Sequence, residues 1–340
     1  MATKTNSRTR GASNASTAPP AKRQKTTVAP FAATFPRRTL LSSSRWVNLP
    51  EDIWVHQILH PFLDLKALST VGRCNTFFEE YWQYVLKQNV IRVPEGCPTM
   101  NQAMDLAVVF SERNECTREN PLKIEVGEGE HVIVCGLFGM AVSCSNITIV
   151  GKGKGKTTML GGFMVRNQQH VTFEGLAVTN HRGHGLYCTG SGTNVDVMKC
   201  VVKECKYTGM NVREGATVTA TQCEFMENGR YGVYCSRANT TARLNDCKVH
   251  HNGEDGLWAV GYAVVDLHGT KTDIHSNKED GIVAYENATV NIHLPPQHNT
   301  SHDNIGEHRY QLEGGSIANI NADGTFTHTE LGDGRRGIIH

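Results

Sequence analysis

A glycine returns at nearly constant spacing through the middle of this chain. The spacings run from 23 to 25 residues, and the positions are Gly185, Gly209, Gly232, Gly256 and Gly281. Each glycine opens a similar short string, such as Gly-Leu-Tyr-Cys or Gly-Val-Tyr-Cys, in which the first and third following residues are apolar. A fixed period of roughly 20–50 residues indicates a repeat architecture, in which each unit stacks on the one before it.

Apolar residues alternate with other residues in three places within each repeat. One run follows the glycine, a second lies nine and seven residues before it, and a third lies fourteen and twelve residues before it. Alternation with a period of two predicts β-strands. No stretch with helical period separates these runs, so leucine-rich, ankyrin and tetratricopeptide repeats do not fit. The pattern predicts a mainly β fold, a parallel β-helix with three short strands per turn and roughly eight turns in all.

Asparagine occupies a fixed place in three successive repeats, four residues before the glycine. These residues are Asn228, Asn252 and Asn277. Asparagine tolerates tight turns and hydrogen-bonds its neighbours there. We therefore expect stacked amide side chains at one corner of the solenoid, as a structural ladder. The cysteines Cys200, Cys223 and Cys247 recur at an inward strand position and are expected to fill the core as small apolar groups.

The first 50 residues differ from the rest of the chain. They hold nine Lys/Arg and no Asp/Glu, although the whole chain has 33 acidic residues. Residues 1–45 are rich in Ser, Thr, Ala and Pro and lack apolar periodicity, which predicts a disordered basic tail. Lys22, Arg23 and Lys25 fit a short basic nuclear-import pattern. The alternative is a solvated basic tail that carries no targeting signal.

Residues 46–90 carry apolar side chains at helical spacing and predict three short helices. The string Leu49-Pro50-Glu51-Asp52-Ile53 and the apolar positions after it resemble an F-box. This resemblance implies docking on a Skp-type adaptor of a cullin–RING ubiquitin ligase. The residues it assigns to adaptor binding are Leu49, Pro50, Ile53, Ile58, Leu59, Leu63, Leu68, Val71 and Phe77.

The strings at 93–96, 124–129 and 147–151 are similar to the opening of pectin-lyase-like right-handed β-helix domains. An F-box followed by such a domain resembles F-box-only proteins with carbohydrate-binding-and-sugar-hydrolase-type repeats. The expected organisation is a tail (1–45), an F-box (46–90), a linker and N-terminal cap (91–121), a right-handed parallel β-helix (122–320) and a C-terminal tail (321–340).

Several motifs that suggest chemistry are incomplete. The stretch from Gly151 to Thr157 has three residues between its glycines where a phosphate loop needs four. Gly183-His184-Gly185 matches one polygalacturonase motif, but residues 156–165 contain no carboxylate to accompany it. Neither His56/His60 nor His298/His302 has the glutamate of a zinc-protease motif, and no CxxC pair occurs. We therefore predict no catalytic residue, no cofactor and no metal site.

One outward row of side chains is the candidate recognition surface. It comprises Tyr187, Asn211, Tyr234 and Trp258, followed by Val283, each between the two inward residues after its glycine. We predict that the first four bind substrate, because aromatic rings with a polar tip give a large contact area. A purely structural role for this row is the alternative. The neighbouring pairs Glu254-Asp255 and Glu279-Asp280 predict a solvated acidic edge, which would favour a basic partner.

The sequence thus predicts a substrate-recognition adaptor of an SCF-type ubiquitin ligase, without enzymatic activity of its own. A Skp-type adaptor and a cullin are the expected partners, with an unidentified protein substrate, no nucleic acid and no membrane. No apolar run reaches the roughly 18 residues of a membrane helix. The expected location is the cytoplasm, the nucleus or both. The alternatives are a β-helical polysaccharide lyase, hydrolase or epimerase, and a non-catalytic scaffold.

Overall fold

The computed structural model describes residues 89–95, 97–113, 115–294, 298, 300–321 and 323–328. Two sets of predicted residues lie outside this part of the chain. The first is the adaptor-binding set, which runs from Leu49 to Phe77, and the second is the import pattern of Lys22, Arg23 and Lys25.

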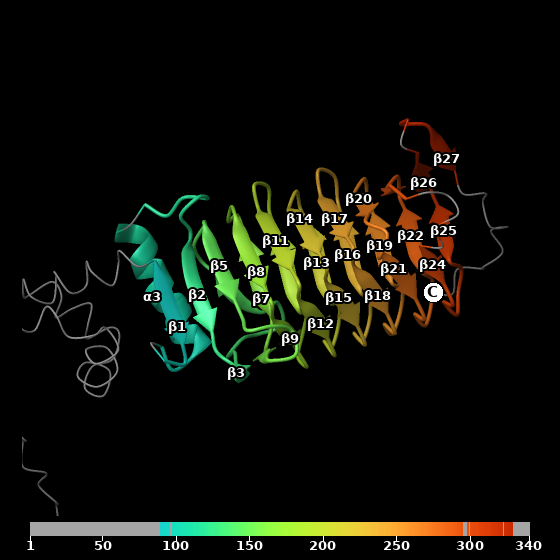
Figure 1. The fold of residues 1–340 in the computed structure, drawn as a ribbon. Coiled ribbons are helices and arrows are strands. Elements are labelled where there is room, and N and C mark those ends of the chain that lie inside the picture. The colour runs from blue at the N-terminus through green and yellow to red at the C-terminus, as the bar shows by residue number, and fades with distance from the viewer. Residues whose placement is uncertain are drawn as a thin grey trace, which may run out of the picture. The chain divides into compact units, whose positions relative to one another are not determined.

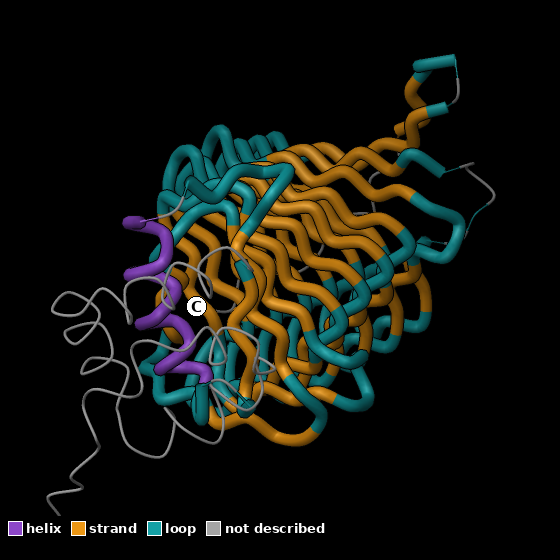
Figure 2. Tube along the Cα trace, turned by 60° about the vertical axis from the view of Figure 1, so that its left-hand side comes forward, coloured by secondary structure: helices purple, strands orange, loops and turns teal. Residues whose placement is uncertain are grey.

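The described residues form a right-handed parallel β-helix of about eight turns, as predicted (Figure 1). Each turn contributes one strand to each of three sheets, which wrap around a common core (Figure 2). The first sheet consists of β1 (Val90–Val93), β2 (Leu122–Val126), β5 (Ile147–Val150), β8 (Val171–Glu174), β11 (Asn194–Met198), β14 (Thr217–Thr221), β17 (Thr241–Asn245), β20 (Val264–His268), β23 (Thr289–Ile292), β26 (Ser316–Ile320) and β27 (Phe326–His328).

The other two sheets contain eight strands each within the described residues. The second sheet consists of β4 (Met140–Val142), β7 (Phe163–Arg166), β10 (Leu186–Thr189), β13 (Met210–Arg213), β16 (Val233–Ser236), β19 (Leu257–Val260), β22 (Ile282–Tyr285) and β25 (Arg309–Leu312). The third sheet consists of β3 (Gly129–Val132), β6 (Thr157–Leu160), β9 (Ala177–Thr179), β12 (Val201–Lys203), β15 (Glu224–Met226), β18 (Lys248–His250), β21 (Asp273–His275) and β24 (Ser301–His302).

The repeated glycines mark places where neighbouring turns approach closely. A Cβ atom on Gly256 would lie 2.6 Å from Cγ2 of Ile274, 2.7 Å from Nδ2 of Asn277 and 2.7 Å from the carbonyl oxygen of Gly281. Real Cβ atoms do not approach other atoms this closely, so any side chain would push two turns apart. Close approach between turns therefore explains why glycine recurs at this point of each repeat.

The predicted asparagine ladder is present and has a fourth member, Asn304. Nδ2 of Asn228 donates to Oδ1 of Asn252 at 3.0 Å, Asn252 donates to Asn277 at 2.9 Å, and Asn277 donates to Asn304 at 2.8 Å. The Oδ1 atoms of Asn252, Asn277 and Asn304 also accept the backbone N–H of the asparagine one turn earlier, for example Asn228 N–H to Asn252 at 3.2 Å. Oδ1 of Asn228 accepts the backbone N–H of Cys205 at 3.1 Å. The buried amides are thus paired along the whole column.

A helix and a strand close the N-terminal end of the β-helix. Helix α3 (Met100–Arg113) turns Met100, Ala103, Met104, Ala107 and Phe110 into the same core as the first turns. Strand β1 extends the first sheet in parallel with β2, although Val90 was expected to end the F-box and the next three residues to belong to the linker and cap. The described helix residues include no segment that is long and apolar enough to cross a membrane.

The C-terminal end of the first sheet differs from the sequence expectation. Strand β27 pairs with β26 in antiparallel orientation, in a segment that was predicted to be a tail. Thr157 begins strand β6 directly after the glycine-rich stretch, so no helix follows that could hold a phosphate loop.

Candidate functional site

The predicted recognition row stands on the outer face of the second sheet. Tyr187, Asn211, Tyr234 and Trp258 are direct neighbours on β10, β13, β16 and β19, because each pairs with the next in parallel register. Val283 on β22 continues the row. The strand alternation that the sequence revealed therefore places these side chains as expected.

Burial divides the row differently from the prediction. Asn211 and Val283 are only 6% and 3% exposed, so neither offers the outward surface that was expected of it. Tyr187, Tyr234 and Trp258 remain half-buried and accessible. Accessible ring surface in this row is therefore confined to these three aromatic residues.

Rings from outside the row complete two aromatic groups. Tyr231, in the turn before β16, stacks on Tyr234 with centroids 5.5 Å apart and meets Trp258 edge-on at 5.1 Å. In the other group, Tyr187 lies 4.8 Å from Phe138 and 5.6 Å from His184. Sequence reasoning missed Tyr231 and Phe138. Tyr231 lies two residues before Val233, at a turn position whose residue type changes from repeat to repeat.

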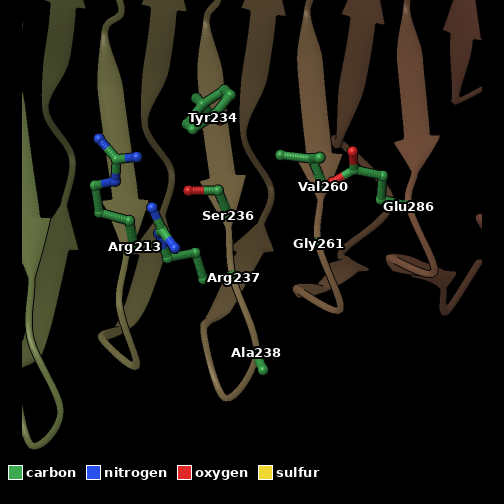
Figure 3. A pocket seen from close by; sticks show the side chains of 8 residues that line it. All are labelled: Arg213, Tyr234, Ser236, Arg237, Ala238, Val260, Gly261 and Glu286. Atoms are coloured by element: carbon green, nitrogen blue, oxygen red, sulfur yellow. The ribbon is translucent and has the colours of Figure 1, made fainter.

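A pocket of about 400 Å³ opens beside Tyr234 (Figure 3). Its floor is the next outward row of the second sheet, in which Arg213, Ser236 and Val260 are direct neighbours. The turn after β16 supplies Arg237 to one wall, and Glu286 reaches in from the turn after β22. The pocket is therefore built from an aromatic ring, a hydroxyl, two guanidinium groups and one carboxylate.

Unpaired polar atoms gather at this face. Nε of Arg213, Oγ of Ser236 and Oδ1 of Asn211 are buried and have no hydrogen-bond partner. Together with Oδ2 of Asp255 they make up four of the seven such side-chain atoms in the described part of the chain. Because buried polar groups are normally paired, this concentration indicates a place where a ligand or ordered water completes the hydrogen bonds.

Positive charge accompanies the aromatic rings. Nε of Arg230 donates to Oε1 of Glu254 at 2.8 Å, and its guanidinium group lies 5.0 Å from the centre of the Tyr231 ring. Nη1 of Arg213 donates to the Tyr187 hydroxyl at 3.4 Å. Burial, aided by the charges of Arg213 and Arg230, lowers the pKa of His184 to about 4. His184 is therefore a neutral imidazole at neutral pH.

One of the four carboxylates of the predicted acidic edge is buried, and the other three are exposed or half-buried. Asp255 is 1% exposed, and its Oδ1 accepts the backbone N–H of Asp280 at 2.7 Å. Burial, together with the charges of Asp280, Glu279 and Glu254, raises the pKa of Asp255 to about 7. Because Asp255 is partly protonated at neutral pH and Glu254 is paired with Arg230, this edge carries less negative charge than four solvated carboxylates would. The preference for a basic partner stays a prediction.

The predicted cysteine column lies in the core. Cys200, Cys223 and Cys247 are 1%, 2% and 0% exposed. Burial raises the pKa of the Cys200 thiol to about 11, so it stays protonated and acts as a small apolar filler.

Residues 157–304 match the family model described as a right-handed beta helix region. No curated protein matches the chain. Among solved structures, the Agl-KA catalytic domain is similar with a TM-score of 0.44 and 15% identity, over 65% of this chain and 41% of that chain. The chain thus spans less than half of that domain.

Two further solved structures are similar at the level of the fold. The A-module of mannuronan C-5 epimerase AlgE4 from Azotobacter vinelandii has a TM-score of 0.30 and 13% identity, over 65% of this chain and 90% of that one. Pectin methylesterase PemA from Erwinia chrysanthemi has a TM-score of 0.28 and 8% identity, over 70% of this chain and 84% of that one.

By their titles these structures are a catalytic domain, an epimerase module and a methylesterase. The prediction that the chain is not an enzyme does not stand, because incomplete sequence motifs are no ground for excluding catalysis. The motifs test only particular spacings along the chain, whereas neighbouring turns bring together residues about 24 positions apart.

Proposed function

We propose that the β-helix is a carbohydrate-active domain that binds an acidic polysaccharide across β10, β13, β16 and β19. The observation that carries this proposal is the pair of unpaired buried groups, Nε of Arg213 and Oγ of Ser236, beside the pocket under Tyr234. Both groups can donate a hydrogen bond to a carboxylate, and an arginine offers charge as well.

The aromatic rings suit the rest of such a ligand. Tyr187, Tyr234 and Trp258 present apolar surface with a polar tip, which can contact the face of a sugar ring while the hydroxyl groups bond to polar neighbours. The row crosses several strands, which lie about 4.8 Å apart, so it offers an extended track rather than a closed cavity. An elongated chain of sugars fits this shape better than a small ligand does.

Proton transfer on the bound chain is the proposed chemistry, with His184 as the base. His184 is neutral and lies next to Tyr187 on the same face. Arg213 is one cause of its low pKa, so a substrate carboxylate that pairs with Arg213 would raise the pKa and make the imidazole a better proton acceptor. Cleavage by elimination and epimerisation both begin with removal of a proton from the sugar ring.

Binding measurements with polygalacturonate and alginate test whether the chain binds acidic polysaccharides. Amylose is the neutral polysaccharide for comparison. The full chain should bind the two polyuronates and not amylose, and binding should weaken as salt concentration rises. Tyr234→Ala with Trp258→Ala, and separately Arg213→Gln, should each weaken binding at least tenfold. Arg118→Gln, an exposed arginine in the loop after α3, should leave binding unchanged.

Product analysis by chromatography tests whether the chain carries out proton transfer on the bound polysaccharide. The full chain should shorten or epimerise a polyuronate that it binds, and His184→Ala should lose this activity while it still binds. Equal binding of amylose and the polyuronates, or wild-type binding by the aromatic and Arg213 variants, would contradict the proposal.

A second candidate function concerns the preceding segment, and the string from Leu49 to Ile53 favours it. We infer that residues 46–90 dock a Skp-type adaptor and thereby join a cullin–RING ubiquitin ligase. The ligand of the β-helix would then be the substrate that is presented to the ligase. This role would require a cytoplasmic or nuclear location, and Lys22, Arg23 and Lys25 would serve as a nuclear-import signal.

Leu49→Ala combined with Leu63→Ala should abolish co-purification of the adaptor and cullin. Truncation of a buried leucine anchor costs on the order of 2–4 kcal/mol of binding free energy. Tyr234→Ala is the control, because it changes the proposed polysaccharide site and should leave adaptor capture intact. Undiminished capture by the double leucine variant would show that this segment is not the docking site.

A further inference from the structure

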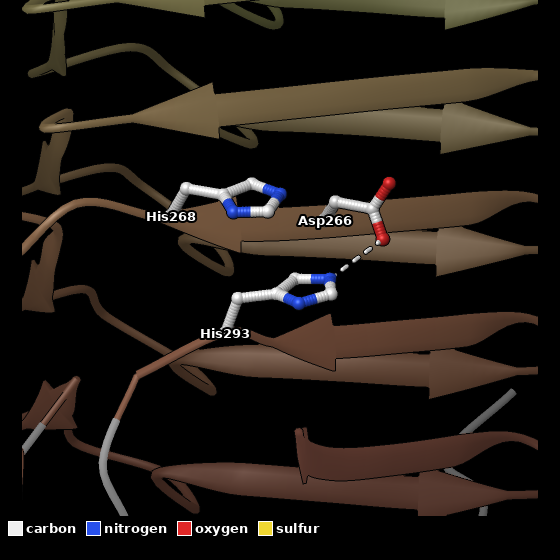
Figure 4. Close-up of side chains that lie close together, drawn as sticks. All are labelled: Asp266, His268 and His293. Atoms are coloured by element: carbon white, nitrogen blue, oxygen red, sulfur yellow. Dashed lines mark hydrogen bonds and ion pairs between the residues drawn. The ribbon is translucent and has the colours of Figure 1, made fainter. Parts of the chain in front are cut away.

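Two histidines and an aspartate meet on the outer face of the first sheet, away from the proposed polysaccharide site. Asp266 and His268 lie two residues apart on β20 and therefore point to the same side of the strand. β20 pairs with β23 so that Leu267 stands opposite Ile292, which places His293 opposite His268 on the next turn. Figure 4 shows the three side chains next to one another.

The side chains offer ligand atoms that lie close together. One nitrogen from each histidine and one carboxylate oxygen all lie within 4.8 Å of one another. The two imidazole rings are stacked, with centroids 4.1 Å apart and planes only 7° from parallel. Nε2 of His293 is 3.4 Å from Oδ1 of Asp266 (Figure 4).

One of these atoms lacks a partner. Nε2 of His268 is shielded from solvent and makes no hydrogen bond. A buried nitrogen without a hydrogen-bond partner costs free energy. The neighbouring side chains on this face of the sheet do not supply a partner for Nε2 of His268. An ion bound in the plane of the His268 ring would give this nitrogen a partner.

We propose that Asp266, His268 and His293 bind a divalent transition-metal ion of the zinc class. Imidazole nitrogen and carboxylate oxygen are ligands that zinc accepts at about 2.0–2.2 Å. Tetrahedral coordination requires ligand atoms about 3.3 Å apart and the ion in the plane of each ring, so one imidazole must turn out of the present stack to bind it. A fourth position would stay open to water.

Neighbouring side chains hold the aspartate in place. Nδ2 of Asn291 donates to Oδ1 of Asp266 at 2.9 Å, and Nη2 of Arg243 lies 3.7 Å from its Oδ2. Contacts of this kind orient the ligands of metal sites. Arg243 also brings a positive charge, which opposes a cation and predicts moderate rather than extreme affinity. A metal at this position would connect two turns of the β-helix that backbone hydrogen bonds already join.

Metal titration of the full chain tests this proposal. After treatment with a chelator, the chain should bind Zn²⁺ in calorimetry, and Zn²⁺ should raise its melting temperature. His268→Gln and His293→Gln should each weaken the binding at least tenfold and remove the thermal shift, and Asp266→Asn should weaken binding to a smaller degree. His181→Gln, an exposed histidine at another corner, should behave as the wild type.

Cobalt serves as the spectroscopic probe, because the chain also contains cysteines. Bound Co²⁺ should give the visible spectrum of nitrogen and oxygen ligands, without the charge-transfer band of a thiolate, and His268→Gln should abolish that spectrum. Melting of each variant without metal shows whether it folds, and His268→Asn replaces His268→Gln if the latter does not. Wild-type Zn²⁺ affinity and an unchanged Co²⁺ spectrum in the folded histidine variants would overturn the assignment.

Discussion

Replacement of Asn252 by alanine should lower the free energy of unfolding by about 3 kcal/mol. Asn252 is fully buried in the middle of the ladder and accepts both the side chain and the backbone N–H of Asn228. It also donates to Oδ1 of Asn277 and to the carbonyl oxygen of Phe225. Truncation would leave several buried groups without partners at once, and each costs about 1–3 kcal/mol, partly relieved by water entry.

Chemical denaturation followed by circular dichroism measures this effect. Asn194→Ala is the matched control, because Asn194 lies on the outer face of β11 and should change stability by less than about 0.5 kcal/mol. Equal stability of the Asn252 and Asn194 variants would mean that the ladder contributes little and that packing of the strands alone holds the turns together.

Replacement of Asp255 by asparagine should make the chain more stable than the wild type at neutral pH, by about 4 kcal/mol. The pKa of Asp255 is raised to about 7 in the folded chain, mainly by burial, whereas an unfolded aspartate titrates near 3.9. Between these values the unfolded chain releases a proton that the folded chain keeps. The wild type therefore loses stability as pH rises from about 4 to about 7 and levels off above that range.

Asparagine resembles the protonated acid and retains an Oδ1 acceptor for the Asp280 N–H, so the two chains should be about equally stable at pH 4. The difference in unfolding free energy between variant and wild type, measured from pH 4 to pH 8, should grow across this window and then stay constant. A difference that does not change with pH would show that Asp255 is not held protonated by the fold.

The face of the second sheet carries mixed charge, although the sequence alone predicts an acidic edge there. From the sequence, Glu254, Asp255, Glu279 and Asp280 looked like four exposed carboxylates. In the structure Asp255 is buried and Arg230 pairs with Glu254. The pocket is lined by Arg213 and Arg237 together with one carboxylate, Glu286. Burial and pairing decide the sign of a surface, and neither can be counted from composition.

Strand corners show a second limit of sequence reasoning. A residue in the left-handed conformation ends successive strands of the third sheet, at Glu204, Glu227, His251 and Ser276. This conformation normally favours glycine or asparagine, so the varied residue types give no local signal. The stacking of equivalent corners fixes the backbone there, and the turn is set by the neighbouring turns rather than by the residue that occupies it.

The sequence by itself determined the period, the three strands of each turn, the inward and outward sides of each strand and the asparagine ladder. These follow from alternation and from close approach at repeated glycines such as Gly256, which act over a few residues and leave a regular trace in the chain. Only the tertiary structure decided which outward groups stay accessible, which buried atoms lack partners and which side chains meet across turns. Arg213 meets Ser236 and His268 meets His293 because stacking joins residues 23 and 25 positions apart, and the chemistry of such a pair depends on burial that no single repeat contains.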